Sequence, residues 1–169
     1  MNALGIVGWS GSGKTTLIVA LLPLLRARGL RVSTVKHAHH GFDMDRPGKD
    51  SYRHRAAGAA EVMVVSGARW ALLHELEGPE PPLSELLVRL ARTDLVLVEG
   101  FKSYPFAKLE VFRAGLGKPA LWRRDASVRA VATDAPAGAG VPELPLNRPE
   151  AVAEWVVRQH AEGALAFTS

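Results

Sequence analysis

The sequence of 169 residues contains no cysteine. Disulfide bonds, thiolate metal sites and cysteine nucleophiles are therefore excluded. No uninterrupted apolar run has the length of a membrane span, and the opening residues lack the basic leader of a signal peptide. These absences predict a cytoplasmic protein with no membrane partner.

The charge is only mildly unbalanced, with 21 Lys and Arg against 17 Asp and Glu. The basic residues are dispersed along the chain rather than clustered, so we expect no nucleic-acid partner. A phosphate-rich small ligand or an acidic protein explains the excess equally well. Apolar residues make up 47% of the chain, an ordinary share for a globular domain.

Residues 8–15 read Gly-Trp-Ser-Gly-Ser-Gly-Lys-Thr and fit the phosphate-loop pattern G-x-x-x-x-G-K-[ST] at each fixed position. A short apolar strand is predicted over residues 4–7, and a helix runs from about Thr15 to Arg28. Backbone N–H groups of such a loop, with the helix start, form a nest for phosphate. The predicted ligand-binding residues here are Gly8, Ser10, Gly11, Ser12, Gly13, Lys14, Thr15 and Thr16.

The last residues of this loop have separate predicted roles. Lys14 should reach the β- and γ-phosphates, and the Thr15 hydroxyl should bind Mg²⁺. The position of Thr16 allows a hydrogen bond to another phosphate.

A densely polar segment follows the second predicted strand, residues 30–36, and becomes helical from about Lys49. It begins where a strand ends, which is the side of a parallel sheet at which ligands bind. Acids here could orient Mg²⁺ or its waters, and cations could neutralise phosphate charge. The candidate acids are Asp43, Asp45 and Asp50, and the candidate cations are Lys36, Lys49, Arg53 and Arg55.

Three histidines in this segment, His37, His39 and His40, raise the possibility of a zinc site. Alternate side chains of an extended chain point apart, and the spacing is not typical of zinc ligands. Contact with phosphate or with a partner is the better interpretation, and a solvated loop is the other alternative.

A second chemical signal lies at residues 94–102. The apolar run 95–98 predicts a strand buried on both faces, and this strand ends in Glu99. Many phosphate-loop proteins place an acid there to hold Mg²⁺ or polarise water. The alternative is an acid that merely begins a loop. Lys102 could contact phosphate or pair with Glu99.

Another predicted strand, residues 128–134, ends in Asp134. A carboxylate can accept hydrogen bonds from N1–H and N2–H₂ of guanine together. Asp134 is therefore a candidate for reading the base, although capping a loop is an equally good role.

The remaining pattern alternates strands and helices and predicts an α/β fold of the phosphate-loop NTPase class, with a mostly parallel central sheet and helices on both faces. We expect one nucleotide-binding domain over residues 1–162 and a flexible tail over 163–169. Further strands are expected at 61–65, 69–75 and 108–113, helices at 83–92 (capped by Ser84) and from 147, and irregular chain at 136–145.

Five stretches together resemble the molybdopterin-guanine dinucleotide biosynthesis protein B family. They are the phosphate loop 8–16, residues 35–40 with Lys-His-x-His-His at 36–40, residues 45–53 with Pro-Gly-Lys-Asp-Ser at 47–51, Ala-Gly-Ala at 57–59, and Val-Glu-Gly-Phe-Lys at 98–102. The resemblance implies a GTP-binding, weakly GTP-hydrolysing accessory protein of molybdenum cofactor biosynthesis that uses Mg²⁺. It further implies a homodimer whose partner is the molybdopterin guanylyltransferase, with molybdopterin as a further candidate ligand.

The candidate catalytic acids are Glu99, Asp45 and Asp50, and the candidate Mg²⁺ ligands are Thr15, Glu99 and Asp45. Two other functions stay open. A small-molecule kinase would use the same loop and needs a lid, for which residues 122–125 are candidates. A non-hydrolysing module for the pterin cofactor would bind only a pyrophosphate in the loop.

Overall fold

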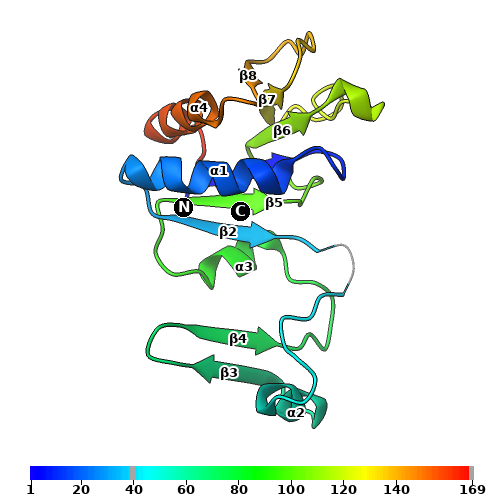
Figure 1. Ribbon diagram of the computed structural model, residues 1–169, viewed down its shortest axis with the longest axis vertical. Coiled ribbons are helices and arrows are strands. Elements are labelled where there is room, and N and C mark those ends of the chain that lie inside the picture. The colour runs from blue at the N-terminus through cyan, green and yellow to red at the C-terminus, as the bar shows by residue number, and fades with distance from the viewer. Residues whose placement is uncertain (39–40, 168–169) are drawn as a thin grey trace. The chain divides into compact units, whose positions relative to one another are not determined.

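A computed structural model describes residues 1–38 and 41–167 of the chain. The chain divides into two compact units (Figure 1). The core unit comprises residues 1–37 and 87–169, and the insert unit comprises residues 38–86. The single domain predicted over 1–162 stays a prediction, because two compact units can still unfold as one cooperative domain.

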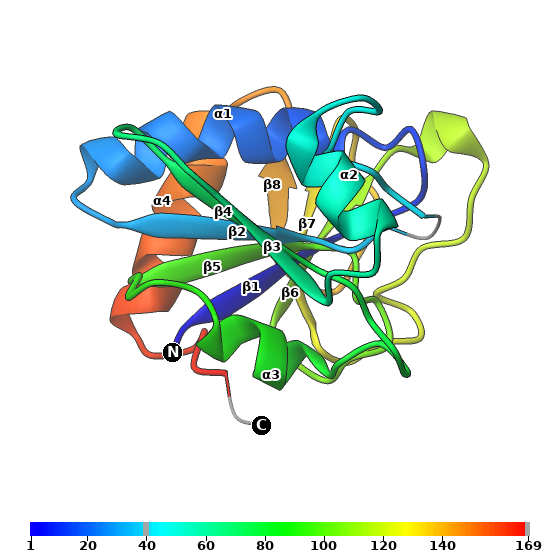
Figure 2. The same cartoon turned by 90° about the horizontal axis from the view of Figure 1, so that it is seen from below.

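The core unit is built on a six-stranded sheet in the order β2-β5-β1-β6-β7-β8, and every pair of neighbours in it is parallel (Figure 2). Parallel neighbours follow from the crossover connections that the alternating pattern predicted, so the α/β class with a mostly parallel sheet is confirmed. The strands are β1 (Ala3–Val7), β2 (Val32–Lys36), β5 (Leu95–Glu99), β6 (Lys108–Phe112), β7 (Val128–Thr133) and β8 (Glu143–Pro145).

Two long helices of the core unit, α1 (Lys14–Ala27) and α4 (Pro149–Ala161), lie side by side and pack against the sheet (Figure 1). Trp155 of α4 is buried with the apolar residues of α1 and the central strands. Gly29 ends α1 in a left-handed conformation, and the Leu30 N–H donates to the Leu25 carbonyl at 3.2 Å. A left-handed glycine is a common way for a helix to end.

Two parts of the core unit differ from the sequence prediction. Residues 136–145 were expected to be irregular, but β8 pairs with β7 along the sheet edge, with Pro145 opposite Thr133. An edge strand tolerates proline because one row of its N–H groups needs no partner.

The chain after α4 was expected to be a flexible tail. Leu165 is instead buried, and its carbonyl accepts a hydrogen bond from the Ala3 N–H at 2.9 Å. The ring of Phe167 also meets Phe106 edge to face. The segment through Phe167 is therefore anchored beside β1, whereas residues 168–169 lie outside the described part.

The insert unit contains α2 (Asp50–Ala56) and an antiparallel hairpin of β3 (Glu61–Val65) and β4 (Trp70–His74). Helix α3 (Leu83–Val88) runs across the boundary into the core unit and is shorter than the predicted helix over 83–92. Because α3 begins at Leu83, Ser84 lies inside its first turn and is not the predicted cap. Among the described residues, no helix is long and apolar enough to cross a bilayer.

Candidate functional site

The loop between β1 and α1 has the backbone that the phosphate-loop pattern requires. Gly8, Gly11 and Gly13 all have positive φ angles, of 145°, 79° and 100°. A Cβ on Gly8 would lie 2.5 Å from the Val111 carbonyl oxygen, so only glycine fits there. Ser12 is buried under this turn, whereas Ser10 and Thr16 are exposed at its outer side and on the first turn of α1. The predicted loop residues therefore lie together.

Lys14 lies among cations at the mouth of this loop. Its Nζ donates a hydrogen bond to the Trp9 carbonyl at 3.0 Å. Burial lowers the pKa of Lys14; nearby Glu99 opposes this, and the positive charges of Lys102 and Lys36 add to it. An anion at this position would be attracted by three ammonium groups, as expected for a polyphosphate site.

Glu99 lies beside the start of α1. The Thr15 hydroxyl donates a hydrogen bond to Glu99 Oε1 at 2.9 Å. The contact arises because β5 pairs in parallel with β1, with Glu99 opposite Ile6, so both strands end at the same edge. A hydroxyl and a carboxylate oxygen this close are the ligand types that Mg²⁺ binds beside a phosphate.

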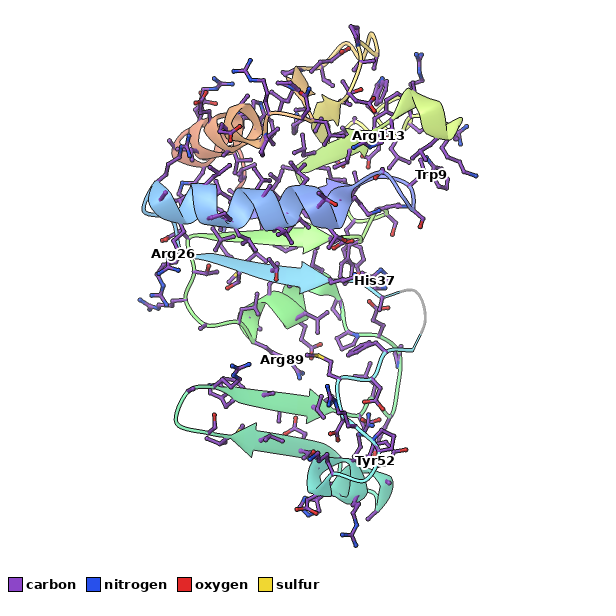
Figure 3. All side chains as sticks on the ribbon, in the orientation of Figure 1. Trp9, Arg26, His37, Tyr52, Arg89 and Arg113 are labelled. Atoms are coloured by element: carbon purple, nitrogen blue, oxygen red, sulfur yellow. The ribbon has the colours of Figure 1, made fainter. Side chains whose placement is uncertain are left out.

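The Lys-His and Glu-Gly-Phe-Lys motifs form one packed element, because β2 lies next to β5 with Lys36 opposite Glu99. The His37 N–H donates to the Glu99 carbonyl at 2.8 Å, and its ring stacks on Phe101 with centroids 4.4 Å apart (Figure 3). Gly100 has φ of 103°, and a Cβ there would lie 2.8 Å from the His37 Cβ. His37 thus packs against the turn that carries Glu99 and Lys102.

Four further predicted site residues, Asp45, Lys49, Asp50 and Arg53, belong to the insert unit. Asp45 accepts a hydrogen bond from the Ser51 hydroxyl at 2.9 Å, and Asp50 lies 3.8 Å from Arg53 in an exposed ion pair. Lys49 occupies the N-cap position of α2. These contacts are local to the unit, so roles for the four residues at the phosphate loop stay predictions.

The other two charged side chains named in that segment, Arg55 and Asp43, form an ion pair with each other. Arg55 donates to Asp43 at 2.6 Å, and this hydrogen bond lowers the pKa of Asp43. His39 and His40 lie outside the described residues.

Arg113 is a site residue that the sequence analysis missed (Figure 3). Its Nε donates to the Ser12 carbonyl at 3.0 Å and its Nη1 donates to Asp134 Oδ2 at 2.8 Å. Arg113 and Asp134 directly follow β6 and β7, which are parallel neighbours with Phe112 opposite Thr133. Asp134, the candidate base reader, is therefore linked to the phosphate loop through one side chain.

Trp9 forms a second unpredicted contact with the loop that follows η1 (Ala114–Leu116) (Figure 3). Its indole N–H donates to the Pro119 carbonyl at 2.7 Å. The Lys102 and Lys118 ammonium groups lie 4.8 and 5.9 Å from the centroid of its ring. Trp9 thus holds two cations beside the phosphate loop through cation–π contact.

Glu110 anchors the segment proposed as a kinase lid. Its carboxylate is fully buried and accepts hydrogen bonds from the N–H groups of Leu121 and Trp122, at 2.9–3.0 Å. Farther along, Asp125 is paired with buried Lys108 at 2.7 Å. A segment fixed at both ends lacks the freedom of a closing lid, which weighs against the kinase alternative.

Comparison with known proteins gives consistent matches along the chain. The profile of the molybdopterin guanine dinucleotide synthesis protein B family matches residues 3–134. The chain is 46% identical over 158 residues to the molybdopterin-guanine dinucleotide biosynthesis adapter protein of Escherichia coli (strain K12), covering 91% of this chain and 90% of that protein. The protein of the same name from Haemophilus influenzae is 42% identical, over 95% and 92% of the two chains.

Solved structures agree with these sequence matches. The crystal structure of Bacillus subtilis MobB superposes with a TM-score of 0.74 at 27% identity, covering 94% of this chain and 98% of that one. A crystal structure of molybdopterin-guanine biosynthesis protein B gives a TM-score of 0.73 at 28% identity, over 94% and 99% of the two chains. The fold is therefore shared with solved MobB structures and is consistent with the phosphate-loop NTPase class.

The buried Glu110 predicts a specific pH dependence of stability. Burial, opposed by its backbone hydrogen bonds, raises the pKa of Glu110 above the ordinary value of 4.5. At pH values between the pKa of Glu110 in the unfolded state and its higher pKa in the folded state, the folded state binds more protons than the unfolded state. The contribution of Glu110 to the free energy of unfolding therefore falls as pH rises above 4.5. Urea unfolding should therefore show that the free energy of unfolding of wild type, relative to that of Glu110→Gln, decreases as pH rises above 4.5.

Glu77→Gln removes an acid from an exposed loop and serves as the control for the loss of one charge. A wild-type advantage over Glu110→Gln that grows with pH would contradict the assignment.

Proposed function

The chain belongs to the molybdopterin guanine dinucleotide synthesis protein B family, and from that premise we propose that it is a GTP-binding, weakly GTP-hydrolysing adapter of molybdopterin guanine dinucleotide biosynthesis. The observation that carries the nucleotide part is the hydrogen bond between Thr15 and Glu99, next to Lys14. It brings a hydroxyl, a carboxylate and an ammonium group to one end of a glycine-rich loop.

In this proposal, the loop N–H groups and Lys14 hold the β- and γ-phosphates of GTP. Thr15 and Glu99 hold Mg²⁺, which neutralises charge on the same phosphates when it is bound. Lys36 adds positive charge from the end of β2, and Lys102 adds it from the turn after β5, because both lower the pKa of Lys14. His37 supports the turn behind Glu99.

The roles proposed for the insert unit follow from the acids and cations of its polar sequence. Asp45 is a further Mg²⁺ ligand and Asp50 a further catalytic acid, while Lys49 and Arg53 contact phosphate. At the other side of the loop, Asp134 accepts hydrogen bonds from the guanine base.

Low turnover and a protein partner are proposed together. The relatives from Escherichia coli and Haemophilus influenzae are named adapter proteins. The segment that could close over a second substrate is anchored by Glu110 rather than free. We therefore assign the chain a cytoplasmic role in which its nucleotide state is read by the molybdopterin guanylyltransferase. Binding of molybdopterin without hydrolysis is the second candidate, favoured by the additional cations beside Trp9.

The hairpin of the insert unit supports the proposed homodimer. Its apolar side chains Met63, Val65 and Trp70 are 58%, 68% and 64% exposed. An isolated two-stranded hairpin is marginally stable in water, and a wide exposed apolar face marks an interaction surface. A second copy of the chain is the proposed cover of this face.

Replacing Lys14 tests the nucleotide part. Lys14→Ala should weaken GTP binding by about 1.5–3 kcal/mol, the size of a lost charged hydrogen bond, which is roughly 10- to 150-fold in Kd. The fold should persist, because Lys14 lies outside the apolar core. Isothermal titration measures the affinity, and circular dichroism reports folding. Unchanged GTP affinity in the folded variant would contradict the site.

Titration of the chain with the guanylyltransferase tests the adapter part. Apo, GDP-bound and GTP-analogue-bound forms should differ in affinity, because a partner can respond to the nucleotide only through differential binding. Lys14→Ala should need roughly 10- to 150-fold more nucleotide than wild type to reach the same change in partner affinity. No complex in any state, together with fast phosphoryl transfer to a small acceptor, would favour the kinase instead.

A further inference from the structure

Arg113 joins the two ends of the proposed nucleotide site, and we infer that it is a positioning residue for guanine selectivity. The inference rests on the proposed GTP binding and goes beyond it, because it assigns the link between base and phosphate recognition to one side chain. Two hydrogen bonds form that link, from Nε to the Ser12 carbonyl and from Nη1 to Asp134.

The strand order places Arg113 between its two contacts. β6 lies between β1 and β7 in the sheet, so the chain segments that follow these three strands emerge side by side. Ser12 belongs to the loop after β1, and Asp134 is the first residue after β7. A guanidinium group is planar and donates in fixed directions. Its contact with Ser12 therefore fixes the direction from which it holds the Asp134 carboxylate.

The phosphate-loop end of this link is rigid. Ser12 is only 1% exposed, and the Arg113 guanidinium lies 3.7 Å from the position of a Cβ on Gly13, the residue that precedes α1. The Asp134 end is looser, since the Arg113 and Asp134 side chains are 42% and 39% exposed. An ion pair this exposed adds little to the stability of the fold. We therefore assign it the role of orienting the Asp134 carboxylate.

The chemistry of the two bases explains the expected selectivity. Each carboxylate oxygen carries two lone pairs, so Asp134 can accept from Arg113 and from guanine N1–H and N2–H₂ at the same time. Adenine presents a ring-nitrogen acceptor where guanine presents N1–H, and a carboxylate repels that acceptor. Selectivity therefore requires the carboxylate to be held toward the base edge, which is the role that we assign to Arg113.

The test compares the dissociation constants of GTP, ATP and inorganic tripolyphosphate for wild type, Arg113→Gln, Asp134→Asn and the double variant. The ratio of ATP to GTP dissociation constants is the readout, because any effect on the phosphate loop alone cancels in it. Each single variant should lower this ratio about tenfold, the size of one charged hydrogen bond. The double variant should lower it no further, since the two residues act as one unit.

Two further variants make the result specific. Arg113→Lys keeps the charge but loses the fork of donors, so it should give an intermediate ratio, and it replaces Arg113→Gln if that variant does not fold. Arg129→Gln removes an exposed arginine from β7 and should leave the ratio unchanged.

The possible failures are distinguishable. A wild type that binds none of the nucleotides overturns the proposed function and this inference with it. A wild type that binds GTP with an unchanged ratio in Arg113→Gln overturns the inference alone. Equal losses of affinity for GTP, ATP and tripolyphosphate in Arg113→Gln would show that Arg113 supports only the phosphate loop. Effects on the ratio that multiply in the double variant would show that Arg113 and Asp134 act independently, which also overturns the inference.

Discussion

The hydrogen bond between Thr15 and Glu99 is the contact on which the site depends. It can form only if β1 and β5 are parallel neighbours that end at the same edge of the sheet. The same condition places Lys36 and His37 beside Glu99 on one side, because β2 pairs with β5. On the other side it places Arg113 beside the loop, because β6 pairs with β1.

This arrangement concentrates positive charge around a loop that is itself rich in N–H donors. Lys14 has a lowered pKa because it is partly buried and because Lys102 and Lys36 lie nearby, although Glu99 offsets part of this. Like charges held together without a counter-ion are unfavourable, and a polyphosphate with its metal relieves that repulsion. The loop therefore has electrostatics that favour an anionic ligand.

What could be predicted from the sequence was local. The phosphate loop, the helix that follows it and the strand that ends in Glu99 follow from residues close together in the chain, and all lie where they were expected. The Arg113 bridge could not be predicted, because it depends on strand order, which periodicity does not give. β8 and the anchored segment at Leu165 were missed because pairing with β7 and β1 overrides the local composition on which the prediction was based.

The most direct test of the metal-nucleotide site is isothermal titration with GTP, in Mg²⁺ and in EDTA, for wild type and Glu99→Gln. Wild type should bind GTP more tightly in Mg²⁺, and Glu99→Gln should lose about tenfold or more of that gain while keeping its affinity in EDTA, because only a charged metal ligand is removed. Glu162→Gln, an exposed acid after α4, is the matched control. An equal gain from Mg²⁺ in wild type and Glu99→Gln would contradict the account.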